Sequence, residues 1–115
     1  MAELIIQRGS TAIIRSTLSP ASLVSGSNIY FMAKYNRTDP DSAVVIEKSS
    51  SDGITVTDAD AGEIVVTIDP ADTRALPNTD VRLAYEIEIE KSGAVYPVDE
   101  GFIQLTSECI QRALA

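Results

Sequence analysis

The chain has 115 residues, of which 44% are hydrophobic and 23% are charged, so it can form one domain with a substantial apolar core. It contains no histidine and one cysteine, Cys109, which excludes an internal disulfide and removes the commonest general base and zinc ligand. The net charge of −8 is concentrated in residues 51–115, which hold thirteen acidic and four basic side chains; such an acidic surface argues against nucleic acid as a partner.

The N-terminal residues and the lengths of the apolar runs indicate the cellular compartment in which the chain folds. Glu3 precedes the first basic residue, Arg8, so residues 1–8 lack the pattern of a signal peptide. The longest apolar runs span four or five residues, far fewer than a membrane span needs. We therefore expect folding in a reducing cytoplasm and no contact with a membrane, with Cys109 as a small, half-buried apolar side chain.

Short apolar stretches separated by turn-forming residues predict seven or eight β-strands and little helix. In chain order, the expected strands are residues 3–8, 11–17, 28–36, 43–48, 54–57, 63–69, 81–90 and 95–105. Turn residues recur every eight to twelve positions, which is typical of an antiparallel β-sandwich. We predict a sandwich domain over residues 1–106 and a tail at 107–115 that is weakly helical or frayed.

The early strands differ in what they predict. The first strand is expected at a sheet edge, where it can pair within its own fold or with a neighbouring chain. Ile5 beside Ile6, and Ile13 beside Ile14, leave open which residue of each pair faces inward. The strand at 28–36 is apolar on both faces, so we expect a central position, with a neighbour or a partner chain covering its second face.

The strand at 81–90 has the clearest pattern in the chain. Its apolar residues are Val81, Leu83, Tyr85, Ile87 and Ile89, and they alternate with Arg82, Ala84, Glu86, Glu88 and Glu90. A period of two over ten residues predicts a strand with one buried and one solvated face. The sequence Lys91-Ser92-Gly93 then predicts a turn into the last strand.

Between the sixth and seventh strands we predict one short helical turn near residues 70–75. Asp69 stands at the capping position, Pro70 at the first helical position, and Pro77 stops any extension. Leu76 is expected to plug the open end of the sandwich. Tyr85 is expected to bury its ring and to donate a hydrogen bond from its hydroxyl to a loop carbonyl.

Two patterns resemble catalytic devices, and both have simpler structural explanations. A serine–lysine pair needs a buried lysine, whereas Lys34, Lys48 and Lys91 stand at expected strand edges or turns. Glu86, Glu88 and Glu90 would lie on one strand face, as a glycosidase carboxylate pair requires. We predict instead a solvated acidic stripe with no reason for a raised pKa, and hence no catalytic residues.

Two further motifs resemble binding or modification sites. Residues 58–63 contain Asp58, Asp60 and Glu63, but lack the third acidic position and the terminal bidentate glutamate of a calcium loop. A hairpin turn, in which Gly62 supplies the positive φ, explains them better. Asn36-Arg37-Thr38 fits a glycosylation acceptor, which is incidental without an export signal. We therefore predict no metal site and no cofactor.

Three segments resemble one family. Ile-Asp-Pro-Ala-Asp-Thr-Arg-Ala-Leu-Pro at 68–77, Leu-Ala-Tyr-Glu-Ile-Glu-Ile at 83–89, and Gly-Ala-Val-Tyr-Pro-Val-Asp-Glu-Gly-Phe-Ile-Gln-Leu at 93–105 resemble small immunoglobulin-like proteins of tailed bacteriophages and prophages, similar to the N-terminal domain of the baseplate upper protein. Residues 4–11, Leu-Ile-Ile-Gln-Arg-Gly-Ser-Thr, match as well. Residues 15–20 depart from the family, so the resemblance does not predict the pairing of residues 11–27.

The resemblance implies an immunoglobulin-like β-sandwich that serves as a structural, non-enzymatic part of a virion. The implied partners are other virion proteins and copies of itself, and the implied place is the tail, the baseplate or, as a decoration, the capsid. The alternative is a carbohydrate- or adhesin-type binding module. Carbohydrate modules display aromatic platforms, whereas this chain has no tryptophan and four tyrosines.

Overall fold

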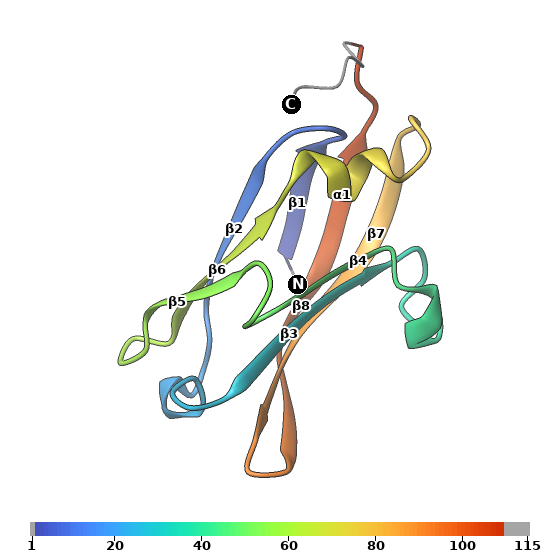
Figure 1. Ribbon diagram of the computed structural model, residues 1–115. Helices are drawn as coiled ribbons and strands as arrows, with labels where there is room; N and C mark the ends of the chain where they lie inside the picture. Colours follow the sequence, from blue (N-terminus) through green and yellow to red (C-terminus); the bar gives the residue numbers. More distant parts are fainter. Residues whose placement is uncertain (1, 110–115) are drawn as a thin grey trace.

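The computed structural model describes residues 2–109, which form two β-sheets packed face to face (Figure 1). The larger sheet has the strand order β1-β8-β7-β3-β4, and the smaller has the order β2-β6-β5. The strands are β1 (Ala2–Gln7), β2 (Ala12–Thr17), β3 (Asn28–Lys34), β4 (Ile46–Ser49), β5 (Ile54–Asp58), β6 (Glu63–Ile68), β7 (Val81–Lys91) and β8 (Ala94–Thr106). The prediction of a β-sandwich is confirmed, with eight strands.

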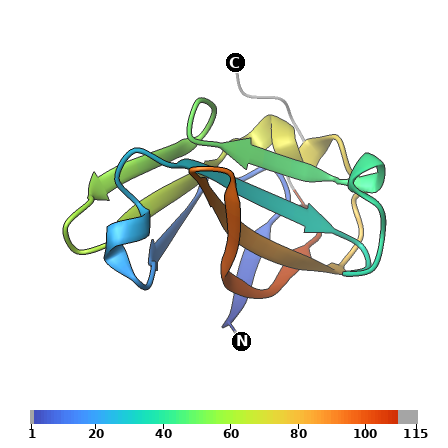
Figure 2. The same ribbon diagram turned by 90° about the horizontal axis from the view of Figure 1, so that it is seen from below.

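The hydrophobic core lies between the two sheets, which Figure 2 shows as separate layers. The alternation predicted for β7 is confirmed, because Leu83, Tyr85, Ile87 and Ile89 are all buried. The two ambiguous pairs are resolved: Ile6 and Ile14 are buried, whereas the exposed fractions of Ile5 and Ile13 are 77% and 57%.

The predicted position of β1 at a sheet edge is confirmed, but its direction breaks the expected antiparallel pattern. β1 runs parallel to β8, with Ala2 opposite Gly101 and Gln7 opposite Thr106. The turn after Gln7 then carries the chain into the other sheet, where β2 pairs antiparallel with β6. A parallel neighbour arises because β1 and β2 belong to different sheets and do not form a hairpin.

The strand predicted at residues 43–48 begins later than expected. After Pro40, the 3-10 turn η2 (Asp41–Ala43) forms, and the backbone N–H of Val44 donates to the carbonyl of Asp41. A residue bonded within a turn cannot join a sheet ladder, so β4 begins at Ile46. The loop before β3 contains a second 3-10 turn, η1 (Ala21–Leu23), and buries Val24.

The helical turn predicted near residues 70–75 is present as α1 (Pro70–Arg74). The carboxylate of Asp72 accepts a hydrogen bond of 2.7 Å from the backbone N–H of Asp69, which caps the first turn. Leu76 follows and is buried at the end of the core, as predicted. The helix thereby closes the end of the sandwich nearest the β1–β2 turn (Figure 1).

The two residues that follow β8 are hydrogen-bonded to the rest of the domain. The backbone N–H of Ser107 donates to Asp80, and that of Glu108 donates to Asn78. Glu108 is buried and forms ion pairs with Arg8 and Arg74. The rest of the tail expected to be helical or frayed, residues 110–115, lies outside the described residues.

Candidate functional site

Two surfaces stand out: the free side of β1, here called the β1 edge, and a groove on the outer face of the larger sheet, here called the acidic groove. The β1 edge consists of Ala2–Gln7 on the side away from β8. The acidic groove has a volume of about 350 Å³. Its lining residues are Tyr30, Met32, Lys34, Arg37, Asp41, Glu47, Ala84, Tyr85, Glu86, Glu88 and Glu90.

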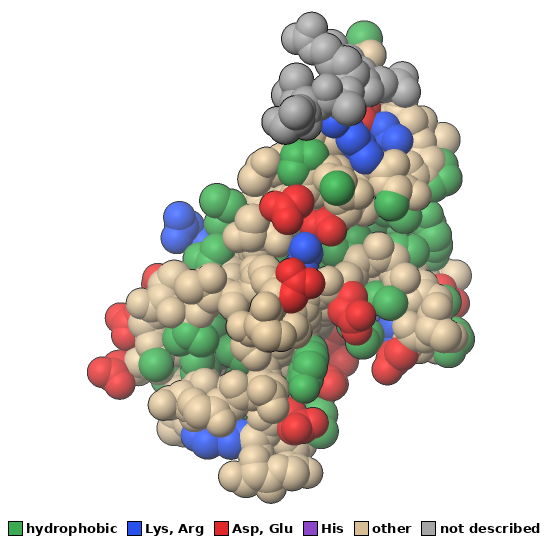
Figure 3. All heavy atoms as spheres, viewed as in Figure 1, with side chains coloured by type: hydrophobic (Ala, Val, Ile, Leu, Met, Phe, Trp, Pro, Cys, Tyr) green, Lys and Arg blue, Asp and Glu red, His purple; other side chains and the backbone are tan. Residues whose placement is uncertain are grey.

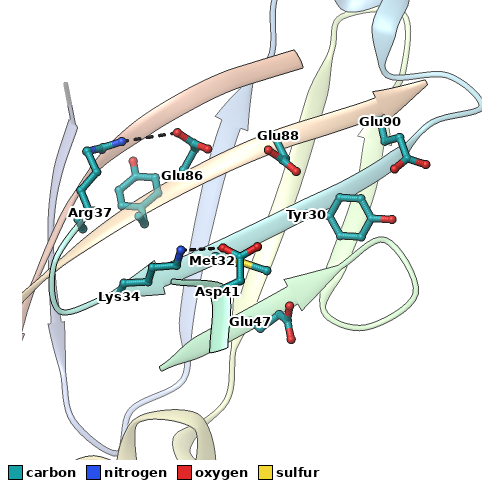
Figure 4. A pocket seen from close by; sticks show the side chains of 11 residues that line it. Tyr30, Met32, Lys34, Arg37, Asp41, Glu47, Glu86, Glu88 and Glu90 are labelled. Atoms are coloured by element: carbon teal, nitrogen blue, oxygen red, sulfur yellow. Dashed lines mark hydrogen bonds and ion pairs between the residues drawn. The ribbon is translucent and has the colours of Figure 1, made fainter. Parts of the chain in front are cut away.

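Two neighbouring strands build the acidic groove. Side chains of β3 and β7 that point away from the core form its floor, and Glu47 of β4 stands at its side (Figure 4). Tyr30 and Met32 are half-buried there. β3 therefore has the predicted position between two strands, but within residues 2–109 its second face lines a groove and is not covered by another sheet.

The charges in the acidic groove are partly paired. Lys34 lies 2.7 Å from Asp41, and Arg37 lies 3.5 Å from Glu86 (Figure 4). Arg37 also lies 3.0 Å from Glu100. Elsewhere on the molecule, acidic side chains are spread over the face shown in Figure 3, and basic ones form a few separate groups. The groove thus carries a local excess of negative charge.

The prediction that no carboxyl group of the acidic stripe has a raised pKa is wrong for Glu88. Burial raises the pKa of the Glu88 carboxyl, and the charges of Glu86, Asp41 and Glu90 raise it further. The alternation along β7 predicts which of its side chains face outward. It does not predict that side chains of β3 and η2 crowd that face. The carboxylates that line the groove could bind a cationic group.

Lys48 stands on an edge strand, β4, as predicted, but it does not have the exposed position expected there. Its side chain is buried and lies 2.8 Å from Asp72. Burial alone lowers the pKa of Lys48, but the hydrogen bond and the negative charge of Asp72 outweigh burial and raise it. A lysine held protonated in this way cannot act as the base of a serine–lysine device.

Tyr85 has only part of its predicted role. Its ring is buried and stacks on Phe31, with the ring centroids 5.5 Å apart. The predicted hydrogen bond from its hydroxyl to a loop carbonyl is absent among residues 2–109. Burial and the charge of Asp99 raise the pKa of Tyr85.

The remaining sequence motifs have structural roles. The carboxylate of Asp58 accepts a hydrogen bond from the N–H of Ala61 inside the β5–β6 turn, as a simple hairpin turn requires. Among the described residues, no three acidic, cysteine or histidine side chains group together as metal ligands. Cys109 is exposed, contrary to the prediction of a half-buried side chain, because β8 ends three residues before it.

The β1 edge is the more apolar of the two surfaces. Ile5 is the most exposed large hydrophobic side chain described. A shallow groove of about 310 Å³, lined by residues 4–7 and 10–14, runs between β1 and β2. The one ionised side chain of β1, Glu3, lies 3.5 Å from Arg82. This surface suits a neighbouring polypeptide strand.

No helix among residues 2–109 is long and apolar enough to cross a membrane. No protein-family model matches the sequence. No curated protein matches it either.

Solved structures match over nearly the whole chain. One is the immunoglobulin-like domain of mouse leukocyte-associated immunoglobulin-like receptor 1, solved as a strand-swapped dimer. It is 14% identical, with a TM-score of 0.50, and the match covers 91% of this chain and 88% of that one. The extracellular domain of the same mouse receptor, also a strand-swapped dimer, is 17% identical, with a TM-score of 0.47 and coverage of 98% and 88%. The match to the immunoglobulin-like domain, with its TM-score of 0.50, shows the fold: the chain is an immunoglobulin-like β-sandwich.

Proposed function

We propose that this chain is a non-enzymatic structural protein of a tailed bacteriophage virion that acts through protein–protein contacts. The observation that carries the proposal is the β1 edge, an unpaired strand with an exposed isoleucine at its centre. An edge of this kind is a template for pairing with another chain. Contacts between chains are the activity that a virion component needs.

The segments that resemble the phage proteins support the proposal through their place in the fold. They follow one another along the chain from the end of β6 through α1 and β7 to β8. The motif at 68–77 supplies the helix cap and Leu76, and the motif at 83–89 supplies the buried side of β7. The resemblance therefore includes residues that build the core and the end of the domain.

The acidic groove supports a second kind of contact, with a larger and more basic virion protein. Glu47, Glu88 and Glu90 form no ion pair among the described residues, whereas the other charged side chains of the groove do. A lysine or arginine from a partner would restore the charge balance at this surface. We propose a place on the tail or baseplate, with decoration of the capsid as the alternative.

Purified particles test the proposal. After density-gradient purification and a wash in high salt, this chain should sediment with the particles, whereas an abundant host protein should be removed. Detection by mass spectrometry in the particle fraction is the expected result. Recovery of the chain only from the unassembled fraction would overturn the virion role and favour a binding module.

A further inference from the structure

We propose, on the basis of the assembly role proposed above, that the partner at the β1 edge is a second copy of this chain, bound by antiparallel pairing of β1 with β1 about Ile5. The two larger sheets would then join into one continuous sheet. Three features of the molecule support this pairing. The other strand edges are protected against pairing, backbone groups of β1 point outward, and the sequence of β1 is complementary to itself.

The other strand edges carry the protections that natural sheets use against pairing. β4 has four residues and an inward-pointing charge, Lys48. β5 is irregular between Val56 and Asp58, where its pairing with β6 shifts in register. β2 carries an exposed charge, Arg15, near its centre. β1 has no proline, bulge or inward charge, and its one ionised side chain, Glu3, lies near the start of the strand and 3.5 Å from Arg82, so it is the least protected edge.

The backbone of β1 offers hydrogen-bonding groups at every second residue. The N–H of Arg8 donates to the carbonyl of Thr106 across the β1–β8 pair, at 2.9 Å. Backbone direction alternates along a strand, so Leu4 and Ile6 also direct their N–H groups toward β8. Glu3, Ile5 and Gln7 therefore direct their N–H and C=O groups outward, away from β8.

The sequence of β1 is complementary to itself in the register that uses those groups. With the two-fold axis at Ile5, each Ile5 faces the other, Glu3 faces Gln7, and Leu4 faces Ile6. The three outward residues then form hydrogen-bonded pairs, with about six backbone hydrogen bonds between the chains. Leu4 and Ile6 stay on the core side of both sheets, since the register keeps each residue on its own face.

The distribution of charge favours the β1 edge over the rest of the surface as the place where a second copy binds. A chain with a net charge of −8 repels its own copies over most of its surface. Residues 1–17 are an exception, because they hold Glu3 against Arg8 and Arg15. The proposed register places no two like charges opposite each other, and a two-fold interface needs such a self-complementary patch.

The first test is the mass of the purified full chain in solution, measured by sedimentation over a range of concentrations. Wild type should form a reversible dimer. Ile5→Lys should raise the dimer Kd more than about tenfold, because it places two like charges at the axis. Val95→Lys, which changes an exposed apolar side chain of the β7–β8 hairpin in the same way, should leave the Kd unchanged, because Val95 lies outside the part of β8 that pairs with β1.

Ile5→Pro separates pairing from folding. The N–H of residue 5 points away from β8, so proline removes an outward donor and leaves the β1–β8 hydrogen bonds intact. This variant should lose the dimer and keep the wild-type Tm at protein concentrations well below the dimer Kd, where both chains are monomeric. Deleting residues 1–8 is a poorer test, because it also removes the buried Ile6 and the Arg8 ion pair.

A disulfide between two copies tests where the two-fold axis of the dimer lies. In a Cys109→Ser background, Ile5→Cys should cross-link under mild oxidation, because opposite Cα atoms in a hydrogen-bonded antiparallel pair lie about 5.5 Å apart. Val95→Cys in the same background should cross-link more slowly. A wild-type chain that stays monomeric up to about 100 μM, a dimer disrupted by Val95→Lys and not by Ile5→Lys, or equal cross-linking rates would each overturn the inference.

These measurements need no particles, so the two proposals fail separately. A monomeric chain that still sediments with virions would remove the β1 pairing and keep the virion role. A dimer that never enters particles would keep the β1 pairing and remove the virion role.

Discussion

At the scale of single residues, Gly62 holds the loop after β2 against the β5–β6 turn. It has a φ of 74°, and its carbonyl accepts a hydrogen bond of 2.7 Å from the N–H of Leu18. A Cβ at this position would collide with the backbone carbonyl of Leu18. The residue therefore meets two requirements, a left-handed conformation and a close backbone approach, that glycine alone satisfies.

Replacing Gly62 with alanine should lower the free energy of unfolding by about 2–4 kcal/mol, since backbone atoms on both sides must move. Gly26 provides the matched control, because its φ is 72° and no atom lies within 4 Å of an added Cβ. Gly26→Ala should lower it by about 1 kcal/mol, the cost of the conformation alone. Urea unfolding measures both, and equal losses would contradict the close approach at Gly62.

Glu88 should destabilise the fold at neutral pH. Its pKa is raised in the folded chain, so the folded chain takes up this proton at a higher pH than the unfolded chain does. Ionised Glu88 therefore opposes folding above its folded-state pKa, and this penalty disappears as the pH falls toward the ordinary glutamate value of about 4.3.

Glu88→Gln should accordingly raise Tm at pH 7, with a gain that shrinks as the pH falls to about 4. Glu47→Gln is the control, because it removes the same charge from an exposed side chain of the same groove. Thermal melts across the pH range measure the difference in Tm between each variant and wild type. A Glu88→Gln chain that melts below wild type at pH 7 would show that the carboxylate stabilises the groove.

At the scale of elements, one ion cluster ties together the β1–β2 turn, α1 and the chain after β8. Arg8 lies 2.5 Å from Glu108 and donates to the carbonyls of Leu76 and Arg74 at 2.9 Å and 3.0 Å. Arg74 approaches the other carboxylate oxygen of Glu108 at 3.2 Å. Three segments distant in sequence thus meet at one buried carboxylate.

Glu108→Gln should lower Tm at pH 7. The hydrogen bond and charge of Arg74, together with Arg8, lower the pKa of Glu108 in spite of burial, so the folded chain loses this proton more readily than the unfolded chain. The stabilisation is complete above about pH 4.3 and is lost as the pH falls through the folded-state pKa. Asp60→Asn, an exposed turn variant, should leave the profile unchanged; an equal effect would contradict the cluster's role.

Most elements could be predicted from sequence because their signals are local. Alternation placed β7 and its buried residues, and the Asp69-Pro70 pair placed α1. The parallel direction of β1 and the burial of Lys48 could not be predicted, since each depends on a segment far away in the chain. The late start of β4 has a local cause, the 3-10 turn η2, which the apolar pattern of residues 43–48 did not indicate. Glu108 was missed for the same reason: its partners Arg8 and Arg74 lie 100 and 34 positions away.

At the scale of the whole molecule, the sandwich presents two surfaces of different chemistry. The β1 edge is apolar and nearly neutral, whereas the acidic groove lies on the outer face of the same sheet, over β3 and β7. The edge position of β1 could be predicted from its place at the start of a β domain. The groove could not, because it needs the pairing of β3 with β7 and the turn η2.

The two surfaces suit two successive contacts, copy to copy along β1 and copy to a basic neighbour at the groove. Pairing about Ile5 leaves the groove free, because β8 and β7 separate β1 from β3 in the sheet. A dimer would then offer two acidic grooves related by a two-fold axis.

The copy number of this chain per purified particle, counted against the major capsid protein by quantitative mass spectrometry, tests the central claim most directly. The account predicts a small, fixed and even number, as a paired component of the tail or baseplate requires. A ratio near one would place the protein on the capsid instead. Absence from the particles would contradict the virion role altogether.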